Sequence, residues 1–148
     1  MARVDVFAGL TPRALELVSS IAVEKTFKRG TVLFRAGEPG DRLFVIVEGK
    51  VRISREVPGM GEEALAIFGP GESFGELSLI DDAPRNADAH AHENCVLLEL
   101  RKDALEHLLY LDKDLAYEVL WNMIRTLASR LRETTDKVTF LAVTGKFS

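Results

Sequence analysis

Between residues 23 and 100 the sequence breaks into short apolar runs separated by glycine-rich turns, and this rhythm limits the fold more than any other feature. The runs are TVLFRAG, RLFVIVEG, KVRISREV, EALAIFG, ADAHAHE and CVLLELR, and the breaks include GEPGD, EGK, PGMGEE and GPGE. Many short strands with such turns favour an antiparallel β-roll or jelly-roll barrel. In VEGKV we expect a tight hairpin in which Gly49 takes a positive φ.

Helical patterns flank this region on both sides. GLTPRALELVSSIAV predicts a short N-terminal helix with Thr11 as its N-cap and Pro12 in its first turn. KDALEHLLYL predicts a second short helix, and a long one is expected from about Lys113 to near Val143. The predicted fold is therefore mainly β with α, in one domain of 148 residues. We assign 1–112 to the N-terminal helix and barrel, and 113–148 to the long helix and a hinge.

The long helix carries a regular apolar seam. Its members are spaced 4, 3, 4, 3, 4, 3 and are Leu120, Ile124, Leu127, Leu131, Thr134, Val138 and Leu141. A heptad pattern of this regularity favours a partner helix, and so a homodimer, over packing against the helix's own barrel. Tyr117, Trp121 and Met123 lie off the seam, and we expect them to pack the helix onto the barrel.

Composition restricts the partners and the compartment. The net charge is −4, which argues against DNA binding by this chain alone, because phosphate contacts need clustered Lys and Arg. No apolar run approaches the length of a membrane span. The single cysteine, Cys95, cannot form an internal disulfide and is expected to be a buried hydrophobe, so the predicted compartment is the cytoplasm.

The stretch FGELSLIDDAPRNA, residues 74–87, is the candidate binding site. Gly75 permits a sharp backbone approach, and ELSLI can form about one helical turn whose free N–H groups bind anions. After the DDAP turn, Arg85 offers a fork of donors suited to phosphate. Ser78 and Ala87 are small and leave the backbone accessible. These features predict a nest for one phosphate.

Glu76 then needs a partner other than phosphate, which would repel it. A carboxylate accepts hydrogen bonds, so its natural target is a hydroxyl. A cyclic nucleotide offers both groups, because its phosphodiester ring leaves the ribose 2′-OH free. Asp81 and Asp82 are interpreted as exposed turn formers. The alternative for Glu76 and Arg85 is an internal salt bridge.

This stretch resembles the phosphate-binding cassette of the cyclic-nucleotide-binding domain family, whose pattern is F-G-E-L-x-L, a short gap, then P-R-x-A. LFRAGEPGDRLFVIVEGKVRI is similar to that family's glycine-punctuated strands. The resemblance implies that Glu76, next to Gly75, receives the ribose 2′-OH and that Arg85 receives the cyclic phosphate. It also implies phosphate contacts from the backbone N–H groups of Ser78 and Asn86.

Further positions carry supporting roles under the same resemblance. Leu77 and Ala87 would support the cassette. Asp41 sits where some members hold an acid that orients the arginine, although it also suits a turn residue in GEPGD.

The segment RLRETTDKVTFLAVTGK resembles the C-terminal helix and hinge of cyclic-AMP receptor members of the family. That implies adenine contacts from Thr134 and Thr135, one from each subunit, while the alternative for Thr134 is that it sets helix register. Asn86 follows the arginine and can face either base, so cAMP is favoured and cGMP stays open. VTGK resembles a hinge that precedes a DNA-binding domain, and whether such a domain follows Ser148 in the native protein stays open.

Two other classes of protein compete with this interpretation. His90 and His92 lie on one face of a strand, as in metal-dependent cupin enzymes, but Val96 and Leu97 occupy the region of the expected third ligand. The other alternative is an effector-altered or nucleotide-free dimerisation domain of a transcription regulator. The sequence favours a non-enzymatic cyclic-nucleotide sensor, with no cofactor and no metal.

Overall fold

The computed structural model describes residues 7–145. Its elements, in chain order, are α1 (Pro12–Ser19), β1 (Ala22–Phe27), β2 (Val32–Phe34), β3 (Arg42–Glu48), β4 (Val51–Val57), β5 (Gly61–Phe68), β6 (Ser73–Phe74), α2 (Leu77–Asp81), β7 (Asp88–Ala91), β8 (Cys95–Arg101), α3 (Lys102–Leu111) and α4 (Lys113–Gly145). The short and long helices predicted after residue 101 are both present.

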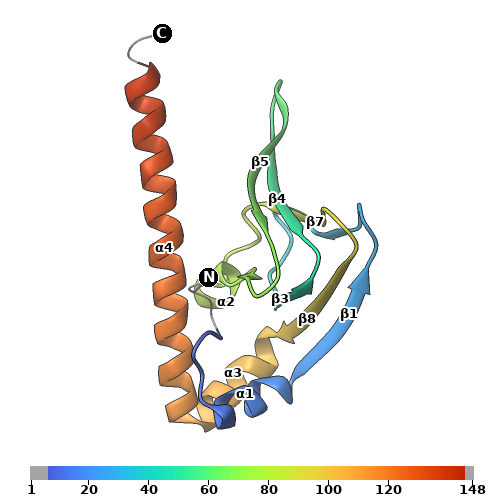
Figure 1. Cartoon of the computed structure of the whole chain (residues 1–148), viewed down its shortest axis with the longest axis vertical. Helices are drawn as coiled ribbons and strands as arrows, with labels where there is room; N and C mark the ends of the chain where they lie inside the picture. The colour runs from blue at the N-terminus through green and yellow to red at the C-terminus, as the bar shows by residue number, and fades with distance from the viewer. Residues whose placement is uncertain (1–6, 146–148) are drawn as a thin grey trace.

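The strands form two four-stranded antiparallel sheets (Figure 1). One has the order β1-β8-β3-β6 and the other the order β2-β7-β4-β5. The predicted fold class is confirmed: antiparallel sheets with a short N-terminal helix and a long C-terminal helix.

The turn at Gly49 differs from the predicted hairpin. Gly49 has the expected positive φ, 86°, but β3 and β4 belong to different sheets and do not pair with each other. The chain instead crosses from one sheet to the other here. A Cβ at Gly49 would lie 2.3 Å from the carbonyl oxygen of Asn94, so this crossing requires glycine because a neighbouring turn lies directly against it.

Helix α1 begins as predicted and ends at Ser19. The Thr11 side chain accepts a hydrogen bond from the Ala14 N–H at 3.2 Å, and Pro12 occupies the first turn. The helix ends at Ser19, because the Ser20 hydroxyl donates to the Leu17 carbonyl and Ala22 already pairs with Leu100 in β8. The strand region predicted from about Val23 begins at Ala22, where cross-strand pairing takes the chain into β1.

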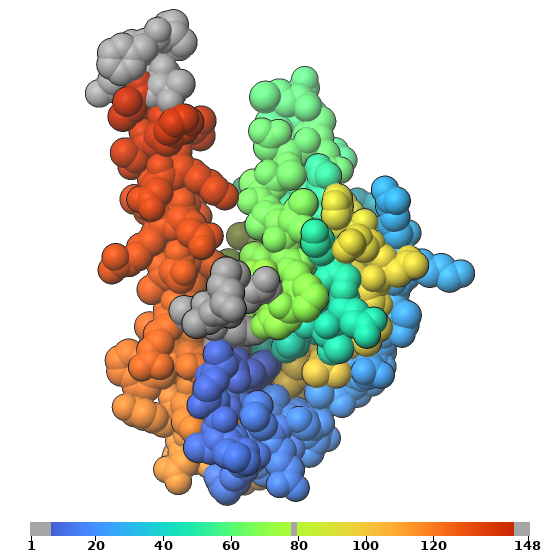
Figure 2. All heavy atoms as spheres, viewed as in Figure 1, coloured from blue at the N-terminus to red at the C-terminus, as the bar shows by residue number. Residues whose placement is uncertain are grey.

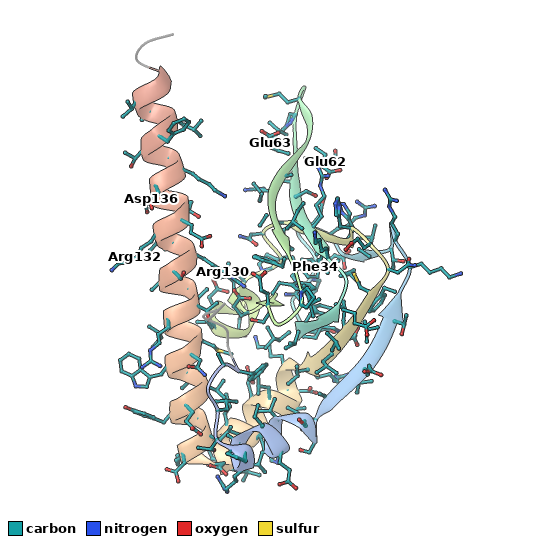
Figure 3. All side chains as sticks on the ribbon, viewed as in Figure 1. Phe34, Glu62, Glu63, Arg130, Arg132 and Asp136 are labelled. Carbon is teal, nitrogen blue, oxygen red and sulfur yellow. The ribbon has the colours of Figure 1, made fainter. Side chains whose placement is uncertain are left out.

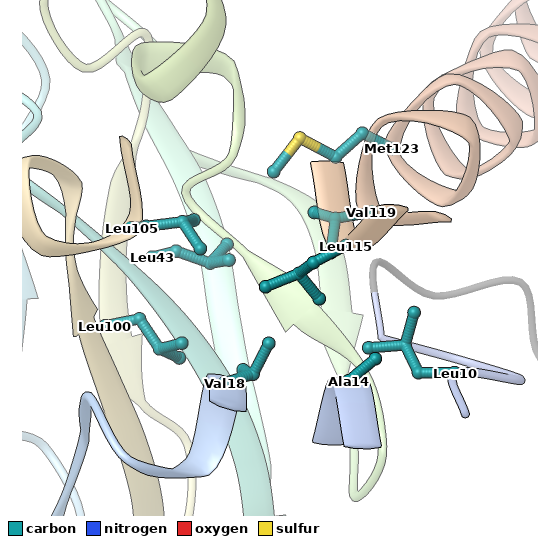
Figure 4. Packing of buried hydrophobic residues seen from close by; sticks show 9 residues of the cluster. All are labelled: Leu10, Ala14, Val18, Leu43, Leu100, Leu105, Leu115, Val119 and Met123. Carbon is teal, nitrogen blue, oxygen red and sulfur yellow. The ribbon is translucent and has the colours of Figure 1, made fainter. Parts of the chain in front are cut away.

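Two apolar clusters hold the molecule together. One fills the space between the sheets and contains Phe44, Ile46, Val51, Phe74, Ala89, Ala91, Cys95 and Leu97. The other, shown in Figure 4, joins the helices to the outer face of β3 and β8 and contains Leu10, Ala14, Val18, Leu43, Leu100, Leu105, Leu115, Val119 and Met123. Its last three members come from α4, so this helix is anchored to the domain by its first three turns.

The rest of α4 is largely exposed. Most seam residues are exposed, among them Leu131 with 66% of its surface accessible. Met123 packs in the core as predicted, but Tyr117 and Trp121 face solvent, so their predicted packing on the barrel is wrong. Figure 2 shows an open gap between the upper half of α4 and the β4–β5 hairpin. None of the helices in residues 7–145 combines the length and the apolar character needed to cross a membrane.

Candidate functional site

Arg85 lies between α2 and β7, and its backbone is fixed by the loop before β3. The Arg85 N–H donates to the Glu38 carbonyl at 2.8 Å, and the Gly37 N–H donates to the Arg85 carbonyl at 2.8 Å. The turn before it is built by two acids, as predicted: Asp81 accepts from the Ala83 N–H at 3.0 Å, and Asp82 takes a left-handed φ of 56°. This turn delivers Arg85 back toward the barrel.

The Arg85 side chain is a buried cation that contacts no carboxylate in the part of the chain the structure describes. It is 5% exposed; Nη1 donates to the Gly75 carbonyl at 3.0 Å and Nη2 to the Arg42 carbonyl at 2.7 Å. Its guanidinium carbon lies 4.1 Å from the centre of the Phe34 ring. Burial lowers the pKa of Arg85, and the charge of Asp41 partly offsets this. A cation whose hydrogen-bond partners are neutral can accept an anionic ligand.

Gly75 makes this position of the arginine possible. Its φ is 88°, and a Cβ there would lie 2.8 Å from Arg85 Nη1 and 3.3 Å from the Arg42 carbonyl oxygen. The structure therefore shows Gly75 making room for Arg85. Its predicted association with the ribose stays a prediction.

Glu76 is held by a residue that the sequence did not single out for the site. Glu76 is 3% exposed, and Oε1 forms an ion pair with Nη1 of Arg130 from α4. Arg130 also donates to the Ser73 carbonyl and places its guanidinium 4.5 Å from the centre of the Phe68 ring. In Figure 3 Arg130 reaches from α4 toward the cassette. The long helix and the candidate site are thus joined directly.

Glu76 and Arg85 are held apart, each by its own set of partners. Glu76 pairs with Arg130 and leaves Oε2 without a hydrogen bond among the described residues, while Arg85 turns to two carbonyls. The alternative of a salt bridge between Glu76 and Arg85 does not describe this structure. Nothing local in the sequence marks Arg130 as a site residue; it lies one helical turn before Thr134, whose hydroxyl donates to the Arg130 carbonyl at 3.0 Å.

Asp41 does not contact Arg85. Its carboxylate accepts from Arg42, from Nε at 2.9 Å and from Nη2 at 3.1 Å, and these hydrogen bonds lower the pKa of Asp41. Its own neighbour in the chain takes the carboxylate, and the predicted orienting role of Asp41 for Arg85 stays a prediction. The charge of Asp41 raises the pKa of Arg85 without a direct contact.

The other predicted site residues lie in the cassette, which includes α2, and on α4. Ala87 is buried beside the cassette, whereas Leu77 and Asn86 are exposed. Ser78 lies in the five-residue helix α2. Thr134 and Thr135 are exposed on α4, one turn past Arg130. The end of the predicted hinge, from Lys146 onward, lies outside the described residues.

A cavity of about 440 Å³ adjoins Arg85 at the open side of the barrel. Its apolar walls include Phe34, labelled in Figure 3, and Phe44, and its charged groups include Asp41, Arg42 and Glu99. Its size falls in the range of small-molecule sites. Arg85 lines this cavity, and Glu76 is not among its lining residues.

The two histidines considered for a metal site lie elsewhere. His90 is in β7, with Nε2 4.0 Å from an oxygen of Glu62, and His92 follows the strand. Within residues 7–145 no group of three or more His, Cys, Asp or Glu side chains is arranged to hold a metal ion.

Residues 24–111 match the family model described as "Cyclic nucleotide-binding domain". The chain is 36% identical over 144 residues to the CRP-like cAMP-activated global transcriptional regulator of Mycobacterium tuberculosis, an alignment that covers 97% of this chain and 62% of that protein. The chain thus spans less than two thirds of the length of this curated relative.

Two solved structures resemble this chain in both fold and sequence. The catabolite activator protein of Thermus thermophilus superposes with a TM-score of 0.80 at 35% identity, over 93% of this chain and 62% of that one. A cyclic nucleotide-binding domain from Methylobacillus flagellatus superposes with a TM-score of 0.83 at 30% identity, over 90% of this chain and 75% of that one.

Proposed function

This chain belongs to the cyclic nucleotide-binding domain family, and from that premise we propose that it is a cyclic-nucleotide sensor whose preferred ligand is cAMP. The ligand binds at the cassette, with no chemical conversion. The Mycobacterium tuberculosis relative is a transcriptional regulator, and the Methylobacillus flagellatus structure is a cyclic nucleotide-binding domain.

The observation that carries this proposal is the state of Arg85. A guanidinium that is 5% exposed and touches only carbonyls and an aromatic ring carries a charge that no described neighbour neutralises by contact. Burying a charge without an opposite charge in contact is unfavourable, and such groups cluster at functional sites, where a ligand can supply the missing charge. A cyclic phosphate supplies one negative charge and oxygens that match the guanidinium fork. The backbone N–H groups of Ser78 and Asn86 complete the phosphate contacts in this proposal.

Glu76 is the proposed acceptor for the ribose 2′-OH. Its Oε2 has no hydrogen-bond partner among the described residues, while Oε1 is taken by Arg130. A hydroxyl that bonds to this carboxylate therefore acts on the same group that holds α4. This shared group is our proposed route from nucleotide binding to the position of α4, with the base reaching Thr134 and, in a dimer, Thr135 of the partner subunit.

The output is proposed to pass through the helix. The exposed seam of α4, from Leu120 to Leu141, fits a second copy of the chain, so the proposed working form is a homodimer. With a net charge of −4, this chain by itself is not proposed to bind DNA. A lone buried thiol, Cys95, is consistent with our placement of the protein in the cytoplasm.

Calorimetric titration with cAMP and cGMP, side by side, tests the proposal. We expect cAMP to bind more tightly, and we expect Arg85→Ala to lose about 2–5 kcal/mol of binding free energy because a charge-paired donor disappears. Arg85→Lys, which keeps the charge and loses the fork, should fall in between. Arg101→Ala removes an arginine that pairs with Asp103 at an exposed position, so it is the matched control and should bind as the wild type does.

Two results would contradict the assignment. Wild-type affinity in Arg85→Ala would remove Arg85 from the site. Absence of heat with both nucleotides, for a folded wild-type protein, would leave the nucleotide-free dimerisation domain as the better description.

A further inference from the structure

Glu99 is a buried carboxylate that the proposed binding mode does not use. It lies in β8 on the face turned toward the inside of the barrel and is 7% exposed. Its Oε2 contacts Nζ of Lys25 at 2.9 Å and Nη1 of Arg42 at 3.0 Å. Lys25 comes from β1 and Arg42 from β3, the two strands that flank β8. Glu99 thus joins all three strands at one point.

Stability alone is a weak reason for this arrangement. Taking a carboxylate out of water costs free energy that ion pairing often fails to recover, so an apolar side chain of similar size would serve the core as well or better. Lys25 is also half exposed, with 47% of its side chain accessible, and exposed ion pairs contribute little. The contact with Arg42 is the one that leads to the binding site.

Arg42 is clamped from two sides. Its Nε and Nη2 donate to Asp41, and its Nη1 donates to Glu99, so each guanidinium nitrogen has an acidic partner. Arg42 is also the first residue of β3, opposite Arg101 of β8, and the Lys102 N–H donates to the neighbouring Asp41 carbonyl at 2.8 Å. The carbonyl of this same residue accepts the 2.7 Å hydrogen bond from Nη2 of Arg85.

The contacts therefore form a chain from β8 to the proposed phosphate contact. We propose that Glu99 is a positioning residue for Arg85: by holding the Arg42 side chain, it fixes the carbonyl that orients the guanidinium. The role rests on the proposed function, because it matters only if Arg85 receives the ligand phosphate.

The geometry explains what this orientation achieves. A guanidinium has five N–H donors, and the carbonyls of Gly75 and Arg42 take two of them, one on each terminal nitrogen. The remaining three include the Nε–H, which has no partner among the described residues. Holding two donors on neutral acceptors fixes the plane of the group and keeps the others free for an anion.

Variants of the full chain test the role through two measurements. In nucleotide-free protein, we expect Glu99→Gln to shift or broaden the Nε–H resonance of Arg85 in a ¹⁵N-edited NMR spectrum. In calorimetry, we expect it to weaken cAMP binding about 10-fold, the equivalent of one lost positioning interaction. Lys25→Met removes the other partner of Glu99 and is the matched control, with binding expected within about 2-fold of the wild type.

A double-mutant cycle separates positioning from a general structural effect. If Glu99 acts through Arg42, adding Glu99→Gln to Arg42→Met should weaken binding no further. An unchanged Arg85 resonance in Glu99→Gln, or an equal loss of affinity in both backgrounds, would overturn the proposal. Thermal unfolding checks that each variant folds. If Glu99→Gln does not fold, Glu99→Asp replaces it in the same two measurements, because it withdraws the carboxylate but keeps the charge.

The NMR measurement also separates this proposal from the proposed function. The measurement uses no nucleotide. If the Arg85 resonance changes in Glu99→Gln but the wild type does not bind cAMP, the positioning contact is supported and the nucleotide is rejected as the ligand.

Discussion

At the scale of single residues, the candidate site depends on a close approach between Gly75 and Arg85. The guanidinium lies where a side chain at position 75 would begin, and it donates to the carbonyl of that same glycine. Phosphate binding is therefore expected to depend as much on the absence of a side chain at residue 75 as on the guanidinium of Arg85.

Gly75→Ala tests this contact, with Gly71→Ala as its control. Both glycines have a left-handed φ, 88° and 85°, so both substitutions should cost roughly 1–2 kcal/mol of stability. A Cβ at Gly71 meets nothing within 4 Å, whereas a Cβ at Gly75 would displace Arg85. We expect only Gly75→Ala to lose cAMP affinity in calorimetry. Equal affinities in the two variants would show that the close approach is irrelevant to binding.

The residues of the site differ in how far the sequence reveals them. Glu76 and Arg85 stand out because opposite charges meet in a stretch of small residues. Arg130 is 54 positions from Glu76, and on a helix with many charges nothing local distinguishes it. Asp41 is similar: the sequence shows an acid near the site, but only the structure shows that its carboxylate pairs with Arg42.

At the scale of elements, α4 presents two different faces. Leu115, Val119 and Met123 bury one face of its first turns against α1, α3 and the sheet. Above them, Arg130 is the polar contact to the cassette, and the opposite apolar face has no partner within the described chain. The heptad spacing found the exposed face, but it could not decide where Tyr117 and Trp121 point, since this depends on how the helix is rotated against the core.

Leu131→Glu tests the seam. A charge at an inward position of a helix pair is strongly unfavourable, so we expect the variant to be monomeric by light scattering at concentrations where the wild type is dimeric. Asp136→Lys is the control: it reverses a charge on the same exposed stretch of α4. Because residue 136 lies off the seam, the dimer should be unchanged. A dimer that persists in Leu131→Glu would place the interface elsewhere.

At the scale of the whole molecule, the sequence predicted the class of fold and the order of its parts better than their connections. The spacing of the glycine-rich turns indicated the strands. The assignment of β3 and β4 to separate sheets arises from long-range pairing, of β3 with β8 and of β4 with β7. The division of the domain at residue 112 stays a prediction.

Nucleotide binding and dimerisation are expected to strengthen each other. If the base contacts one residue from each subunit, each event lowers the free energy of the other by the same amount. We expect saturating cAMP to tighten the dimer by about 5–150-fold, the usual size of such coupling, in sedimentation experiments across a range of protein concentrations. Arg85→Ala is the control and should show no such shift. A dimer constant independent of cAMP would mean that the nucleotide acts within one subunit.

The anchoring of α4 by its base has a mechanical consequence. The helix has 33 residues, or about 50 Å of length at 1.5 Å per residue, and it is gripped by core packing only near its start. Arg130 lies about halfway along this helix, so a force on Arg130 acts near the midpoint of its length. A displacement of about 1 Å at that point, with the base as pivot, becomes about 2 Å at the far tip. A small movement at the pocket is thereby amplified with distance.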